Sequence, residues 1–267
     1  MNHTATTIDA RPELIQIRDA TLAYPTASGL PVQALDTIDL TIDNGTFVSL
    51  VGPSGCGKST LLKILAGLLR QSTGDVFLDG DELTGPTPAV GVVFQQPVLL
   101  PWLTILENVL LPIHVQKRNA NDYRDRAHDL LRTVGLGEFS SRYPSELSGG
   151  MQQRAGIVRA LVPDPEILLM DEPFGALDAL TREQMNDELQ RIWLEQQKTV
   201  FFITHSISEA VYLSDRVLVM SERPGRIVAD FSVGLSRPRQ LQDMNTPIFG
   251  DLTAEIRGLL NAKGGID

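Results

Sequence analysis

The chain has 267 residues, of which 42% are hydrophobic and 21% are charged, a balance typical of a globular protein with one large domain or one domain and a subdomain. Its formal net charge of −10 argues against a protein that coats nucleic acid, because such binding relies on Lys and Arg to neutralise phosphates. The single cysteine, Cys56, excludes a disulfide within the chain and fits a reducing compartment. We find neither a signal-peptide pattern nor an apolar stretch long enough to span a bilayer, and we therefore expect a cytosolic protein.

After a polar and patternless leader, residues 1–12, short apolar runs bounded by Gly and Pro predict a series of strands. An apolar-rich run at 58–69 predicts a helix. The predicted strands are 14–17, 38–42, 47–51, 76–78, 90–94, 167–170, 200–204 and 217–220. Together these segments predict an α/β fold.

The pattern becomes helical between about residues 97 and 161, with a charged amphipathic helix at 122–134 and another helix that begins near Ser148. We interpret this insert as a helical subdomain within a main domain that spans residues 13–236. The tail, 237–267, carries apolar residues at helical spacing. This stripe predicts a C-terminal helix that packs on the body of the protein.

A glycine-rich loop of the pattern GxxxxGK[ST] follows the predicted strand 47–51 and leads into the helix at 58–69. In a strand, loop and helix of this kind, backbone N–H groups and the helix N-terminus face a polyphosphate. We expect Lys58 to reach the β and γ phosphates, Ser59 to bind Mg²⁺ and Thr60 to support the α phosphate. The sequence therefore predicts a site for ATP and Mg²⁺, with the loop residues Gly52, Pro53, Ser54, Gly55, Cys56, Gly57, Lys58 and Ser59.

Polar residues follow three other predicted strands, at the ends where ligands bind in open α/β sheets. They are Gln95, the pair Asp171 and Glu172, and His205. Asp171 suits a role in holding Mg²⁺, and Glu172 suits that of a general base or water-positioning group. Taken alone, the acidic pair could cap the next segment, His205 could be a hydrogen-bonded core residue and Gln95 a plain loop residue. Their joint occurrence favours a catalytic site.

A second anion-binding segment is predicted where Ser148, Gly149 and Gly150 begin a helix, because a Ser cap and two small residues expose its N-terminus. One chain with two such segments and one nucleotide loop suggests that the second segment serves another copy.

This order of motifs resembles the ATP-binding-cassette (ABC) family, specifically the ATPase subunits of bacterial ABC importers, over about residues 14–227. The resemblance implies a P-loop NTPase (RecA-like) core with an antiparallel β subdomain and a helical subdomain. It also implies a head-to-tail homodimer, in which each ATP lies between the glycine loop of one subunit and Ser148, Gly149 and Gly150 of the other.

The resemblance also implies roles for single residues. Gln95 would sense Mg²⁺ and the attacking water, and Asp178 would communicate across the dimer. His205 would hold the γ phosphate, which makes Lys58, Gln95, Glu172 and His205 the catalytic set. Tyr24 matches the aromatic residue that stacks on adenine, although an exposed turn tyrosine is the alternative.

Two positions depart from the family pattern. Met151 replaces the Gln that usually follows the two glycines, and Gly175 stands where Ser is common. Neither residue is the proposed general base, so we still expect the protein to hydrolyse ATP.

The segment after Gln95 is too apolar for a solvated loop and predicts either a buried segment or an interface. In ABC subunits this stretch forms the groove that receives a short helix of the membrane permease. The resemblance thus implies docking through Gln96, Leu99, Leu100, Trp102 and Leu103, at the cytoplasmic face of the inner membrane. The integral permease subunits would in turn meet a periplasmic or lipid-anchored solute-binding protein.

Residues 100–109 and the tail around 247–249 are similar to the nitrate, sulfonate and taurine importer subfamily. We also expect no regulatory β-domain after residue 267 and no nucleic-acid partner. Two alternatives stay open: an ABC ATPase of a lipid or lipoprotein exporter, and a non-transport ABC ATPase that acts on DNA or ribosomes.

Overall fold

A computed structural model describes residues 13–25, 29–175 and 177–261. The predicted leader, residues 1–12, lies outside the described residues, as do the last six residues of the predicted tail. Within the described part, no helix is both long and apolar enough to cross a lipid bilayer.

A six-stranded sheet forms the centre of the molecule, with the strand order β10-β9-β3-β8-β7-β6. Neighbouring strands from β9 to β6 run parallel, and β10 pairs antiparallel with β9 at the edge. The sequence reading missed β10, because this half-exposed strand mixes apolar and polar residues. The strands are β3 (Phe47–Val51), β6 (Val90–Val93), β7 (Ile167–Asp171), β8 (Thr199–Ile203), β9 (Arg216–Met220) and β10 (Ile227–Ser232).

A smaller antiparallel sheet has the order β2-β1-β4-β5 and contains β1 (Glu13–Tyr24), β2 (Val32–Asp43), β4 (Thr73–Leu78) and β5 (Asp81–Glu82). Its first two strands are much longer than predicted. The register of β1 shifts between Ile17 and Ala20, where Asp19 has a positive φ of 48°. This irregularity interrupts the alternation of apolar and polar residues by which a strand is recognised in a sequence.

Four helices follow predicted segments, although the one after the glycine-rich loop ends at Leu65, four residues earlier than predicted, just before Ala66 and the positive-φ residue Gly67. The helix Ile105–Val115 lies in the insert that was predicted to be helical, whereas the helices Ala179–Gln196 and Ile207–Leu213 were not predicted. The helices are α1 (Lys58–Leu65), α2 (Ile105–Val115), α3 (Asn121–Thr133), α4 (Gly149–Leu161), α5 (Ala179–Gln196), α6 (Ile207–Leu213) and α7 (Pro247–Asn261). Short 3-10 turns cover Gly137–Phe139, Pro144–Glu146 and Leu241–Asn245.

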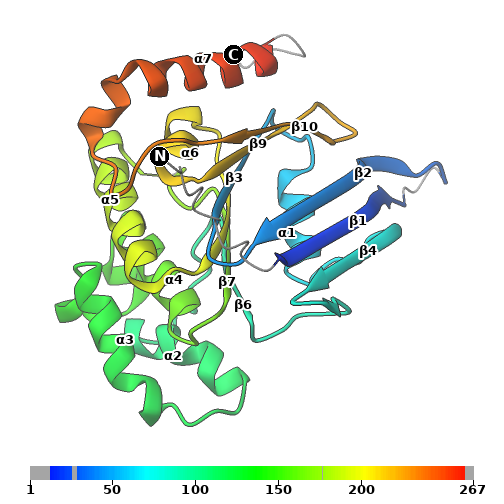
Figure 1. The fold of residues 1–267 in the computed structure, drawn as a ribbon. Coiled ribbons are helices and arrows are strands. Elements are labelled where there is room, and N and C mark those ends of the chain that lie inside the picture. Colours follow the sequence, from blue (N-terminus) through cyan, green and yellow to red (C-terminus); the bar gives the residue numbers. More distant parts are fainter. Residues whose placement is uncertain (1–12, 26–28, 176, 262–267) are drawn as a thin grey trace, which may run out of the picture.

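The large sheet separates two hydrophobic cores, and β3 contributes to both. Val48 and Leu50 pack with the small sheet and α1, whereas Phe47 and Val51 face the core built with the other helices. Figure 1 shows β1, β2 and β4 to one side of the large sheet and α2 to α5 to the other. The predicted stripe of the tail joins the second core through its buried residues Phe249, Ile256 and Leu260. The predicted domain boundaries stay predictions.

Candidate functional site

The glycine-rich loop connects the buried strand β3 with the N-terminus of α1, as predicted. Gly57 caps the helix with a φ of 116°, and a Cβ on it would lie 2.7 Å from Leu35 Cδ2. Both the left-handed backbone and the close packing require glycine at this position. The loop is therefore held tightly over β2 while its backbone faces a cleft.

Lys58 is buried beneath this loop. Its Nζ donates hydrogen bonds to the carbonyl oxygens of Gly52 and Pro53, each at 2.8 Å. Cys56 is only 1% exposed, and burial raises the pKa of its thiol while the Lys58 ammonium opposes the rise. The side chain of Cys56 therefore packs behind the loop instead of facing the cleft.

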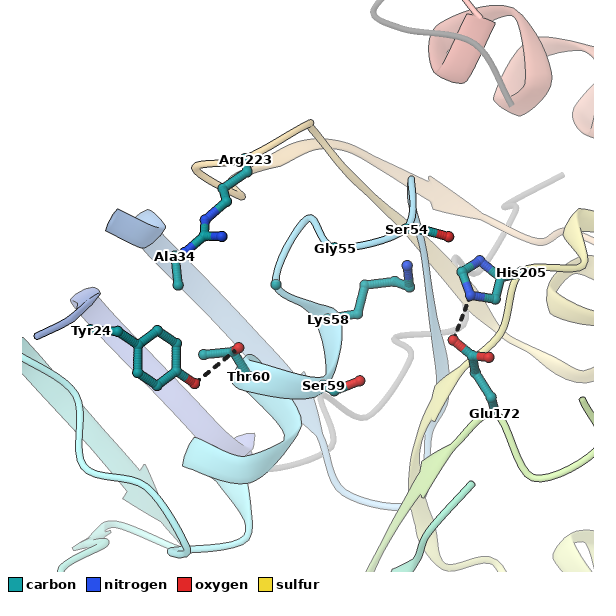
Figure 2. Close-up of a pocket in the computed structure, with 11 residues that line it drawn as sticks. Tyr24, Ala34, Ser54, Gly55, Lys58, Ser59, Thr60, Glu172, His205 and Arg223 are labelled. Carbon is teal, nitrogen blue, oxygen red and sulfur yellow. Dashed lines mark hydrogen bonds and ion pairs between the residues drawn. The ribbon is translucent and has the colours of Figure 1, made fainter. Parts of the chain in front are cut away.

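The cleft beside the loop gathers predicted residues from distant parts of the chain (Figure 2). The hydroxyl groups of Tyr24 and Thr60 lie 3.3 Å apart. Ala34 and Arg223 also line the cleft but were not predicted, because neither belongs to a recognisable motif. The described lining residues are Tyr24, Ala34, Ser54, Gly55, Gly57, Lys58, Ser59, Thr60, Glu172, His205 and Arg223.

Two oxygen-bearing side chains meet where Mg²⁺ was predicted. The Ser59 hydroxyl donates to Asp171 Oδ1 at 3.1 Å. A hydroxyl and a carboxylate are hard oxygen donors that suit Mg²⁺, which takes few protein ligands and completes its shell with phosphates and water. The described residues contain no cluster of three or more His, Cys, Asp or Glu side chains that could hold a metal ion by itself. The donor chemistry of the pair fits a Mg²⁺ ion that also binds phosphate oxygens and water.

The strand order explains why the other strand-end residues come together. Strand β8 lies between β3 and β7, with Ile203 in register with both Leu50 and Asp171. The carboxyl ends of β3, β8 and β7 therefore lie side by side, next to that of β6.

Glu172 is the centre of this strand-end group. Its Oε1 lies 2.6 Å from His205 Nε2, and its Oε2 accepts a hydrogen bond from Gln95 Nε2 at 3.2 Å. Gln95 thus contacts the predicted base directly, whereas its predicted role as a Mg²⁺ ligand stays a prediction.

A second hollow lies beside Glu172 and His205 and is also lined by Gln95, Arg182 and Glu209. Glu209 is buried, burial raises the pKa of its carboxyl, and the Thr204 hydroxyl donates to it. The sequence reading missed Arg182 and Glu209, because both lie on helices whose packing places them here.

The predicted second anion segment does not line either of these hollows. Ser148 is exposed and caps α4 by accepting from the backbone N–H of Met151 at 3.3 Å, and Gly149 is exposed with open space around it. Asp178 caps α5 in the same way, through the backbone N–H of Thr181 at 2.9 Å. Hydrogen bonds from Thr181 lower the pKa of the Asp178 carboxyl.

The predicted docking segment is partly exposed and is fixed from beneath. Trp102 is 69% exposed and Gln96 is also exposed, whereas Leu99, Leu100 and Leu103 are half-buried. Buried Asn108 bonds both the N–H and the C=O of Leu100. The segment is therefore neither fully buried nor a solvated loop.

Comparison with known proteins identifies the family. Residues 35–175 match the family model described as ABC transporter. The chain is 47% identical over 254 residues to the taurine import ATP-binding protein of Rhizobium johnstonii, which covers 93% of this chain and 97% of the relative. This chain belongs to the ABC transporter family. The aliphatic sulfonates import ATP-binding protein of Bacillus thuringiensis subsp. konkukian is 45% identical over 78% of this chain and 82% of its own length.

A solved structure supports the same assignment. The cassette MJ0796, described as a dimer in a post-hydrolysis state bound to ADP and Pi, matches with a TM-score of 0.74 and 34% identity, over 84% of this chain and all of that chain. The predicted fold is confirmed: a P-loop core with an antiparallel β subdomain and a helical subdomain. The chain is an ABC transporter ATPase.

Proposed function

We propose that this ABC ATPase drives the import of a small sulfonate such as taurine through a separate permease. The observation that carries the proposal is the 47% identity to a taurine import ATPase over nearly the whole of both chains. A second relative named for aliphatic sulfonates supports the same solute class.

ATP would lie along the cleft with its base on Tyr24 and its phosphates on the glycine loop. Lys58 supports this placement, because its ammonium is already directed into the loop, 2.8 Å from the carbonyl oxygens of Gly52 and Pro53. On binding, Lys58 would turn to the β and γ phosphates, and backbone N–H groups of the loop would surround them. Ser59 and Asp171 would hold Mg²⁺, which neutralises charge on the phosphates when it is bound.

Hydrolysis would then depend on the residues at the strand ends. Glu172 would accept the proton of the attacking water, and His205 would bind the γ phosphate through the nitrogen that contacts Glu172. Gln95, which already donates to Glu172 Oε2 at 3.2 Å, would orient that water.

The active form would be a head-to-tail homodimer. Ser148, Gly149 and Gly150 are the first residues at the N-terminus of α4, and they would meet the γ phosphate bound to the partner. Asp178 would take part in communication between the two subunits of the dimer. Dimers of the related cassette MJ0796 support this assembly.

The permease would bind Gln96, Leu99, Leu100, Trp102 and Leu103, which places the ATPase peripherally on the cytoplasmic face of the inner membrane. The solute-binding protein would act through the permease. Gln95 lies next to this segment and contacts Glu172, so ATP-driven changes at the base would reach the docking surface.

The test is solute uptake by membranes that contain this subunit with its permease and binding protein. Labelled taurine should enter faster than nitrate and only with ATP, and a Glu172→Gln subunit should abolish uptake. Uptake of nitrate but not of taurine would overturn the solute class, and export of lipid by the same assembly would overturn import.

A further inference from the structure

The turn between β9 and β10 packs against the glycine-rich loop. Gly225 donates its N–H to Ala34 O at 3.0 Å and accepts from Asp36 N at 2.9 Å. A Cβ at this position would lie 2.1 Å from the carbonyl oxygen of Cys56. Contacts that only glycine permits therefore hold the turn against both β2 and the loop.

The same turn is also held by its own side chains. Ser221 Oγ donates to the carbonyl oxygen of Glu222 at 2.9 Å and accepts from the backbone N–H of Arg226 at 3.1 Å. A turn fixed in this way presents its side chains in a set direction, which lowers the entropy that they lose on binding a ligand.

Arg223 projects from this turn into the cleft. Its Nε donates to the carbonyl oxygen of Gln33 at 3.1 Å, and Gln33 is in register with Ala23, the residue before Tyr24. Within the described chain, the two terminal guanidinium nitrogens have no hydrogen-bond partner. Figure 2 shows Arg223 at the end of the cleft near Tyr24 and Ala34, away from Glu172 and His205.

We propose that Arg223 binds the nucleoside end of ATP, opposite Tyr24. This inference rests on the proposed placement of ATP, because phosphates at Lys58 leave the base and ribose between Tyr24 and Arg223. A planar guanidinium stacks on an aromatic base and donates to ribose hydroxyls. Among the described lining residues, Lys58 and Arg223 are the only Lys or Arg side chains, and Figure 2 shows them at separate places along the cleft.

The test compares ADP, which carries a nucleoside, with tripolyphosphate, which carries none. Calorimetry in one Mg²⁺ buffer would measure the Kd of ADP and of tripolyphosphate. Arg223→Ala should raise the Kd of ADP about two- to fivefold, the range for an exposed guanidinium on a ring, and leave that of tripolyphosphate unchanged. Arg226→Ala is the matched control, since it is an exposed Arg of the same turn that does not line the cleft.

An unchanged Kd of ADP in a folded Arg223→Ala protein would overturn the inference, and so would an equal loss for tripolyphosphate. Lys58→Ala separates this failure from that of the proposed site. If Lys58→Ala weakens both ligands while Arg223→Ala weakens neither, the ATP site stands and only Arg223 is excluded. If Lys58→Ala weakens neither ligand, the proposed ATP site itself is wrong.

Discussion

Glu172 adopts a backbone conformation that is rare for residues other than glycine, with a φ of 46°. Its backbone N–H donates to Ile203 O at 2.9 Å, and its carboxylate contacts His205 and Gln95. Strain of about 1–2 kcal/mol persists only where surrounding contacts fix it, and such strain is common at functional sites. Glu172 lines the cleft one residue after the proposed Mg²⁺ ligand Asp171.

We expect Glu172→Gln to bind ATP normally and to lose nearly all turnover. The amide has the same shape but cannot accept a proton, so kcat should fall about 10²- to 10⁴-fold. Steady-state ATPase assays and equilibrium ATP binding measure the two effects. Glu183→Gln, at an exposed position of α5, should match the wild type. Near-normal turnover in Glu172→Gln would remove this residue from the mechanism.

Cys56 should react slowly with maleimides at neutral pH, because burial raises its thiol pKa and the thiolate is the nucleophile. A raised pKa shifts ionisation upward, so the labelling rate should still be rising at pH values where an exposed thiol is already ionised. Labelling should block ADP binding, since the adduct must displace the loop above it. Mass spectrometry reports the rate and Cys56→Ala is the control; full ATPase activity after complete labelling would contradict the steric effect.

At the scale of elements, the short helix α6 is held at both ends. Ser206 caps its N-terminus beside His205 by accepting from Glu209 N at 3.2 Å. At its C-terminus, buried Arg239 donates to the carbonyl oxygens of Val211 and Ser214 at 2.8 and 2.7 Å. A guanidinium at this end satisfies carbonyls that a helix leaves without partners.

Arg239→Ala should therefore lower the free energy of unfolding by about 2–4 kcal/mol, because it leaves several buried carbonyl groups without donors. Urea unfolding followed by far-UV circular dichroism measures the loss. Arg257→Ala, on the exposed face of α7, should stay within about 0.5 kcal/mol of the wild type. Equal stability of the two variants would show that the Arg239 contacts contribute little.

The docking segment owes its shape to polar groups beneath it. Arg159 donates to the carbonyl oxygens of Val98 and Pro97 at 2.8 and 2.7 Å, while Asn108 holds Leu100. These hydrogen bonds hold the backbone of the segment and leave Trp102 exposed on the surface. Aromatic residues often anchor protein interfaces.

Trp102→Asp should leave the soluble ATPase activity unchanged and weaken permease association about tenfold or more, as loss of an aromatic anchor does. Co-purification with the permease and surface plasmon resonance would measure the association. Ile248→Asp serves as the control, because Ile248 is also exposed, at 62%, but lies on α7. Unimpaired assembly of Trp102→Asp would refute the docking role.

At the scale of the whole molecule, the sequence predicted those site residues whose position follows from motif and strand order. Glu172, His205 and Gln95 meet because apolar strands of one parallel sheet end beside each other. Arg223 could not be predicted, since it reaches the cleft only through a turn that Gly225 packs against Cys56. Glu209 likewise lines the second hollow only because of where α6 packs. Such contacts depend on tertiary packing, which leaves no periodic signal in the sequence.

The proposed head-to-tail homodimer can be tested by mixing two variants that are each inactive alone. Lys58→Ala damages the glycine loop, whereas Ser148→Asp keeps a cap on α4 but places a negative charge where the partner's phosphate would lie. In a composite site, a mixed dimer pairs one intact Lys58 with one intact Ser148. In an equal mixture, half of the dimers contain one subunit of each variant. Each of these mixed dimers has one of its two sites intact, so up to about a quarter of the wild-type activity should return.

Each variant alone should stay inactive, and wild-type specific activity should fall on dilution toward the monomer, as measured by ATPase assay beside analytical ultracentrifugation. This follows because Ser148 lines neither hollow of its own subunit, so that a monomer would bind ATP without the γ-phosphate contacts that a second copy would supply. A mixture no more active than the average of its two components would place Ser148 outside the site. Activity strictly proportional to concentration down to the monomer would exclude the dimer as the hydrolytic unit.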